Sequence, residues 1–131
     1  MTELPARVVI VSHEQWAPAG LRAELRERGV DAVGVRDIPE ALTQHPKSDR
    51  GPVRLLVIDQ DTLSDDVHAG MLPRVRTRLG DPRVILLAHA TRETPPGDWE
   101  LVLRRPVTIG EVADTVQRLL PHTGSAGTLD R

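Results

Sequence analysis

Apolar residues in this chain gather in short, nearly continuous runs, which are separated by longer stretches of mixed polarity. Three of the runs are rich in Val, Ile and Leu: 7–11, 53–58 and 84–88. Runs of this length and composition are typical of strands that are covered on both faces, as in a parallel sheet between helices. Two shorter runs, 32–35 and 101–103, are the other strand candidates. The pattern therefore predicts five strands.

The first and third intervals between these runs carry amphipathic patterns. The segment 17–28 is followed by Gly29, which predicts a helix with a glycine C-cap. Ser64 is placed to cap a helix whose apolar residues recur at helical spacing as far as Leu79. Pro73 lies inside that pattern and is expected to shorten or kink the helix.

Capping boxes predict the start of two more helices. The segments Asp37–Glu40 and Thr108–Glu111 both have an N-cap residue followed three positions later by glutamate. A short helix is expected to run to about Gln44. A longer amphipathic helix is expected over 109–120.

The predicted elements alternate between strand and helix except at one place. Residues 89–100 read HATRETPPGDWE, where two prolines and a glycine leave little room for a helix. We therefore predict an α/β fold with one doubly wound, five-stranded parallel sheet, helices on both faces, and a fourth helix that is shortened or missing. The folded domain is expected over 1–120, and 121–131 has the composition of a flexible tail.

Composition excludes several classes of function. The chain has 131 residues, which suffices for one domain, and its net charge of −2 argues against general attraction to nucleic acid or membranes. It has no cysteine, so disulfides and thiolate chemistry are excluded. We find no signal peptide pattern and no apolar run approaching the ~20 residues of a membrane span. A cytoplasmic location is expected.

Aromatic residues are scarce, so the core is expected to be aliphatic. Phe and Tyr are absent, and Trp16 and Trp99 are the two aromatic residues. Both are expected in loops near the carboxyl edge of the sheet. Each could plug that edge or anchor a partner protein, because tryptophan is enriched at interface hot spots.

Polar residues follow the predicted strands at the edge where open α/β sheets bind ligands. They are Ser12, His13, Asp59, His89 and Arg105. One interpretation is a small-ligand-binding or enzymatic domain that uses Ser12, His13, Asp59 and Arg105. A metal site would need His13, Asp59 and His89 to converge. Another hypothesis is a pH-sensitive pair of His13 and Asp59.

Several segments resemble the receiver domain of two-component response regulators, over about residues 6–120. They are VVIVSHE (8–14), LRAELRERG (21–29), LLVIDQD (55–61), VILLAHA (84–90) and LRRPVTIGEV (103–112). The resemblance lies in the order and spacing of these segments rather than in any one of them. It implies a flavodoxin-like fold and a role in two-component signalling.

The resemblance places Asp59 at the phosphoacceptor position. It places Ser12 and His13 where an active receiver has two acidic ligands for a divalent cation, and Arg105, before a proline, where it has a lysine. A phosphoryl group on a carboxylate needs a cation and a lysine to neutralise its charge. Of these four positions, only Asp59 keeps the residue of an active receiver.

The positions that transmit activation are also altered. Ala88 stands where an active receiver has a hydroxyl, and Val102 stands where it has the aromatic switch residue. The crossover that normally moves on activation is the one truncated within 91–100. We therefore interpret the chain as an atypical receiver, or pseudo-receiver, that acts in signalling without phosphorylation, with no cofactor, no metal and no enzymatic activity.

A conventional phosphoaccepting receiver is the alternative within this family. Glu14 could supply one cation ligand, and Arg105 keeps a positive charge near Asp59. Mg²⁺ would be bound weakly by so few oxygen ligands.

The expected partners are signalling proteins, with a homodimer as a further option and with neither nucleic acid nor membrane. By the resemblance, the interaction surface is built from loop 91–100, strand 101–103 and helix 109–120. Its candidate residues are Trp99, Leu101, Val102, Arg104, Val112 and Val116.

Overall fold

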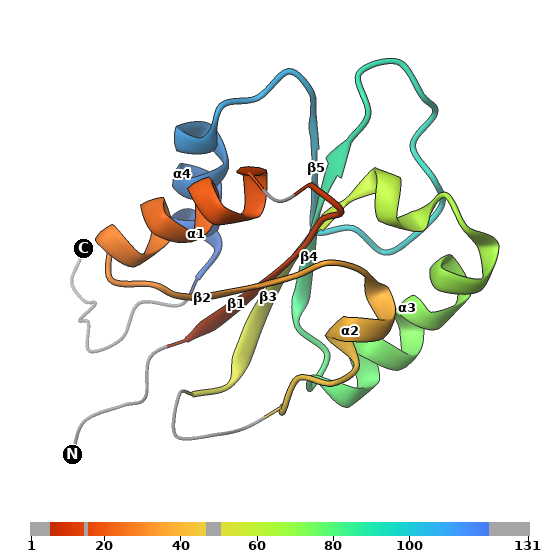
Figure 1. Ribbon diagram of the computed structural model, residues 1–131, viewed down its shortest axis with the longest axis horizontal. Helices are drawn as coiled ribbons and strands as arrows, with labels where there is room; N and C mark the ends of the chain where they lie inside the picture. Colours follow the sequence, from red (N-terminus) through yellow and green to blue (C-terminus); the bar gives the residue numbers. More distant parts are fainter. Residues whose placement is uncertain (1–5, 15, 47–50, 121–131) are drawn as a thin grey trace.

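The computed structural model describes residues 6–14, 16–46 and 51–120. A parallel five-stranded sheet in the order β2-β1-β3-β4-β5 lies between two layers of helices (Figure 1). The strands are β1 (Arg7–Val11), β2 (Asp31–Val35), β3 (Val53–Asp59), β4 (Arg83–Ala88) and β5 (Leu101–Arg104). The helices are α1 (Trp16–Glu27), α2 (Ile38–Ala41), α3 (Asp66–Arg78) and α4 (Ile109–Leu119), with a 3₁₀ turn η1 (Gln60–Leu63). The predicted fold class is confirmed, and the proposed tail 121–131 lies outside the described residues.

The core consists of two aliphatic clusters, one on each face of the sheet. Because side chains alternate along a strand, Val8 and Ile10 face α1 and α4, whereas Val9 and Val11 face α2 and α3. Figure 1 shows α1 beside α4 on one face and α2 beside α3 on the other. The strands are covered on both faces, which explains their nearly continuous apolar sequences. No helix of the described residues is long and apolar enough to cross a membrane.

Local capping interactions set most of the helix starts. In α4 the predicted capping box is confirmed: the Glu111 N–H donates to Thr108 Oγ1 at 3.0 Å, and the Thr108 N–H donates to Glu111 Oε1 at 2.7 Å. In α2 the Asp37 carboxylate caps the Glu40 N–H at 2.8 Å. That helix ends at Ala41, short of the predicted Gln44.

Two predictions about α3 are corrected: its N-cap residue, and its shortening at Pro73. The N-cap is Asp65, whose carboxylate accepts from the N–H groups of Val67 and His68, while Ser64 ends the preceding 3₁₀ turn. The helix also continues through Pro73 to Arg78. Proline removes one backbone donor, but buried residues on both sides of it hold the helix against the sheet. They are Leu72, Val75 and Leu79.

The crossover from β4 to β5 contains no helix, as predicted. Residues 89–100 form a loop, and Trp99 packs half-buried against the cluster on the α2 and α3 face. Its indole N–H donates to the Pro95 carbonyl oxygen at 2.9 Å. Gly97 lies so close to the ring that an added Cβ would be 2.5 Å from Trp99 Cζ2. Trp99 therefore takes part of the place of the missing helix, whereas the side chain of Trp16 is outside the described residues.

We predict that Gly97→Ala destabilises the protein by about 1–3 kcal/mol, because the new methyl group overlaps the indole ring and must displace it. Urea unfolding measures the change. The matched control is Gly70→Ala in α3, where an added Cβ meets nothing within 4 Å and where alanine favours the helix. A Gly97→Ala protein as stable as the wild type would show that Trp99 is not held in this packing.

Candidate functional site

Asp59 is the centre of a polar cluster at the carboxyl edge of the sheet. It ends β3 and is 2% exposed. Its Oδ2 accepts hydrogen bonds from Arg105 Nη2 at 2.6 Å and from the Ser12 hydroxyl at 3.2 Å. Its Oδ1 accepts from the Asp61 backbone N–H at 3.0 Å. Both carboxylate oxygens are therefore engaged by groups of the protein itself.

Arg105 comes to Asp59 from the turn between β5 and α4. Its backbone N–H continues the sheet ladder by donating to the Ala88 carbonyl oxygen at 3.0 Å. Its side chain is 28% exposed, and Nη2 also lies 3.9 Å from Oε1 of Glu14, an ion-pair distance beyond hydrogen-bonding range. One guanidinium thus serves two carboxylates, with Asp59 much the closer.

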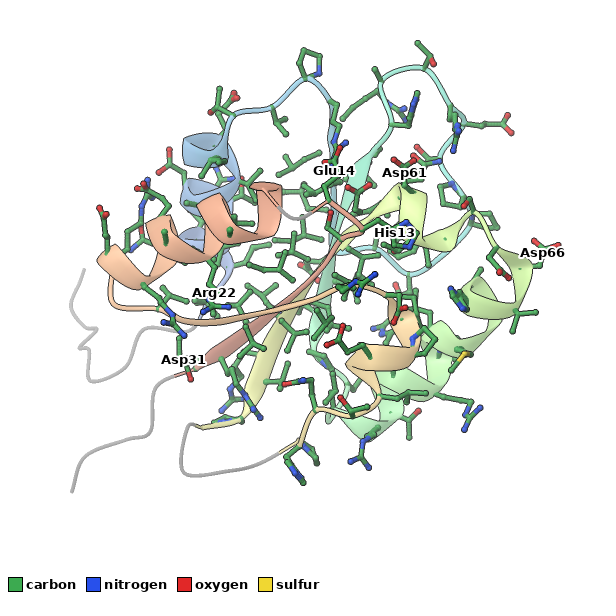
Figure 2. All side chains as sticks on the ribbon, in the orientation of Figure 1. His13, Glu14, Arg22, Asp31, Asp61 and Asp66 are labelled. Carbon is green, nitrogen blue, oxygen red and sulfur yellow. The ribbon has the colours of Figure 1, made fainter. Side chains whose placement is uncertain are left out.

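Ser12 lies where the sequence predicted it, beside Asp59, but His13 does not join them. Ser12 is 4% exposed, and its hydroxyl oxygen also accepts from the Glu14 N–H at 3.2 Å. His13 is exposed, and within the described part of the chain it forms no hydrogen bond or ion pair with Asp59. Figure 2 shows it on the side of the sheet nearer α3. The structure therefore contains no Ser-His-Asp relay and no His13–Asp59 pair.

His89 follows β4 but turns into its own loop. Its ring Nδ1 accepts from the Thr91 N–H at 3.2 Å. Among residues 6–14, 16–46 and 51–120, no three His, Cys, Asp or Glu side chains are placed to hold a metal ion. His13, Asp59 and His89 consequently do not form the metal site that the sequence left open.

The cluster offers few free oxygen ligands for Mg²⁺. The resemblance to receivers places Ser12 and His13 where two carboxylates are expected. The Asp59 carboxylate already bonds a guanidinium, which occupies one of its oxygens.

Gln60 is a buried residue of this site that sequence reasoning missed. It is 8% exposed, and its amide Nε2 donates to the Glu93 carbonyl oxygen at 2.9 Å. Its Oε1 accepts from the His89 N–H at 2.7 Å. The side chain therefore ties the end of β3 to the 89–100 loop. A buried amide next to an irregular loop has no sequence pattern, so only the position after Asp59 could have drawn attention to it.

The proposed interaction surface needs correction. Val116 is 0% exposed and Val112 is 4% exposed, because α4 turns both toward the sheet. Trp99, Leu101 and Val102 are half-buried. Arg104 is exposed, but its guanidinium donates to the carbonyl oxygens of His89 and Arg92 at 2.7 and 2.9 Å and contacts the Thr94 hydroxyl.

The two other candidate residues from the sequence analysis are Ala88, at the end of β4, and Val102, within β5. Ala88 ends β4 and is fully buried. Val102 lies in β5, paired with Leu86. Neither side chain offers a hydroxyl or an aromatic ring, which are the groups that the resemblance to receivers calls for at these two positions.

Structure comparison shows which fold carries this site. The receiver domain of the hybrid histidine kinase CckA superposes with a TM-score of 0.67 at 23% identity, covering 88% of this chain and all of that one. The chain has the receiver fold. The Vibrio cholerae chemotaxis protein CheY4 shares this fold with a TM-score of 0.64 at 18% identity, covering 88% of this chain and 99% of that one.

A third match was solved with a partner. The receiver domain of Saccharomyces cerevisiae Ssk1, in complex with the histidine phosphotransfer protein Ypd1, has a TM-score of 0.65 at 15% identity and covers 91% of both chains. No protein-family profile and no curated protein sequence matches the chain. At these identities the comparisons establish the fold, and the site must be interpreted from its own residues.

We predict that Arg105→Gln destabilises the protein by about 1–3 kcal/mol, because it leaves the Asp59 carboxylate buried without its cation. Asp59→Asn and the double variant complete a mutant cycle in urea unfolding. A coupling energy of about 1 kcal/mol or more is expected.

Arg92→Gln is the matched control for this cycle. It breaks an ion pair with Asp61 of 3.5 Å in which both side chains are largely exposed, so a loss below about 1 kcal/mol is expected. Additive effects of the Arg105 and Asp59 substitutions would mean that the pair is not formed in solution.

Proposed function

We propose that this protein is a pseudo-receiver: a signalling module with the receiver fold that binds partner proteins without phosphorylation at Asp59. The observation that carries the proposal is the 2.6 Å contact between Arg105 Nη2 and Asp59 Oδ2. The proposal includes no catalytic activity, no bound cofactor and a cytoplasmic location.

The first argument concerns charge at the acceptor oxygen. A phosphoryl donor would have to approach a carboxylate that is 2% exposed and whose Oδ2 is held by Arg105 and Ser12. A hard cation normally offsets the charge of the arriving group. Here the guanidinium takes the cation's place in the ground state, so the Asp59 charge is already offset before any phosphoryl group arrives.

The second argument concerns the segment that would report phosphorylation. The 89–100 loop is held by Gln60 from η1, by Arg104 from β5 and by the packing of Trp99. Neither Ala88 nor Val102 provides a group that could sense a phosphoryl oxygen. A loop tied in this way favours a single conformation, which suits a partner that recognises a constant surface.

The partner class is inferred from the fold. The Ssk1 receiver was solved in complex with a phosphotransfer protein, which shows that a receiver surface of this kind can dock another signalling protein. We propose a signalling protein, or a second copy of this chain, as the partner. Neither nucleic acid nor a membrane is part of the proposal.

The decisive experiment is a Mg²⁺ titration with and without beryllofluoride, followed by amide NMR shifts. We expect no saturable shifts near Asp59 in the wild type, because Arg105 holds the acceptor oxygen. A Ser12→Asp, His13→Asp, Arg105→Lys variant is the positive control and should gain Mg²⁺-dependent shifts around Asp59. Shifts in the wild type that spread to 101–119 and vanish in Asp59→Asn would establish a phosphoaccepting receiver instead.

A further inference from the structure

An apolar groove of about 540 Å³ opens between Leu21 of α1 and the β5–α4 turn with the first turn of α4. We call it the α1–α4 groove, and its defining residues are Glu14, Leu21, Leu87, Arg105, Ile109 and Val112. It lies at the carboxyl edge of the sheet, where open α/β folds bind ligands. Asp59 does not line it, so the groove is distinct from the phosphoacceptor position.

Its shape and lining suit a small molecule. Small-molecule sites typically have volumes of about 300–1,000 Å³, with mostly apolar walls and a few polar groups. Elsewhere on the described surface the only large hydrophobic side chain that is exposed is Val67, at 71%. Exposed apolar surface is therefore concave rather than spread over a broad face.

One wall of the groove is formed where α1 and α4 contact each other. Gly20 of α1 faces Ile109 of α4, and an added Cβ on Gly20 would be 2.7 Å from Ile109 Cδ1. The glycine lets Ile109 approach α1 and form a wall. Leu87 and Val112, which are 9% and 4% exposed, lie deeper and reach solvent only slightly.

The charges at the rim of the groove favour a positively charged ligand. Arg105 bonds Asp59, and among the described residues Glu14 Oε1 has no hydrogen-bond partner, 3.9 Å from the guanidinium. Two carboxylates therefore share one cation, which leaves a formal charge of −1. Glu14 Oε1 itself is buried, but the Glu14 side chain is 39% exposed, so a cation can approach the carboxylate group from solvent. Such a cation offsets the charge that Arg105 leaves uncompensated.

We propose that the α1–α4 groove binds a small amphiphilic cation, with its hydrocarbon part against Leu21, Ile109 and Val112 and its ammonium or amidinium group on the Glu14 carboxylate. The proposal shares the Arg105–Asp59 contact with the proposed function but needs no partner protein, and probe binding in the groove is measured separately from the response of Asp59 to Mg²⁺ and beryllofluoride.

The test uses three probes of one chain length: hexylammonium, 1-hexanol and hexanoate. Methyl NMR of the wild-type protein follows Leu21, Leu87, Ile109 and Val112. Hexylammonium should shift these methyl signals and bind about three- to tenfold more tightly than 1-hexanol, with hexanoate the weakest. Glu14→Gln should bring hexylammonium to the affinity of 1-hexanol while leaving 1-hexanol unchanged.

Two variants control for net charge and for the cavity itself. Glu27→Gln changes the net charge equally at an exposed position at the end of α1 and should keep the preference for the ammonium probe. Ala90→Leu, in the groove lining, should weaken all three probes. The proposal is overturned if no groove methyl shifts, if hexanoate binds best, or if Glu14→Gln leaves the preference unchanged.

Discussion

The contact between the Arg105 guanidinium and the Asp59 carboxylate is the interaction on which the rest of this edge of the molecule depends. A carboxylate that is 2% exposed needs a partner, since burial of an unpaired charge costs several kcal/mol. By meeting that need, Arg105 draws the β5–α4 turn onto the end of β3. Among the described residues it also leaves one Glu14 oxygen without a hydrogen-bond partner. The engaged Asp59 carboxylate and the charge at the groove rim therefore have one cause.

The 89–100 loop replaces the crossover helix between β4 and β5, and yet β5 still pairs with β4 in the sheet. Hydrogen bonds from Arg104 and Gln60 satisfy carbonyl oxygens that a helix would have paired internally. Trp99 supplies apolar area against the sheet. Arg104 remains exposed while it makes these bonds, so its place in an interaction surface stays a prediction.

The sequence predicted the sheet because every strand is an aliphatic run and α4 begins at a paired capping signal. It also placed Ser12, His13 and Arg105 at the same edge as Asp59, since the carboxyl ends of parallel strands share one edge, and of these Ser12 and Arg105 contact Asp59. It failed for Ser64 because Asp65, a neighbour, is an equally good cap. It failed for Pro73 because tertiary packing outweighed the lost donor. The direction of His13, the ties made by Gln60 and the groove depend on side-chain orientation, which periodicity does not determine.

The helix-free crossover bears on the order in which the sheet assembles. A crossover helix would nucleate locally and deliver β5 to β4 as a preformed unit. Without it, β5 must close the 89–100 loop before its backbone pairs, and that closure costs chain entropy. The β1–β3 and β3–β4 pairs extend over five positions each, whereas β5, at the edge of the sheet, pairs with β4 over four. We therefore expect β5 to dock after the central strands have paired.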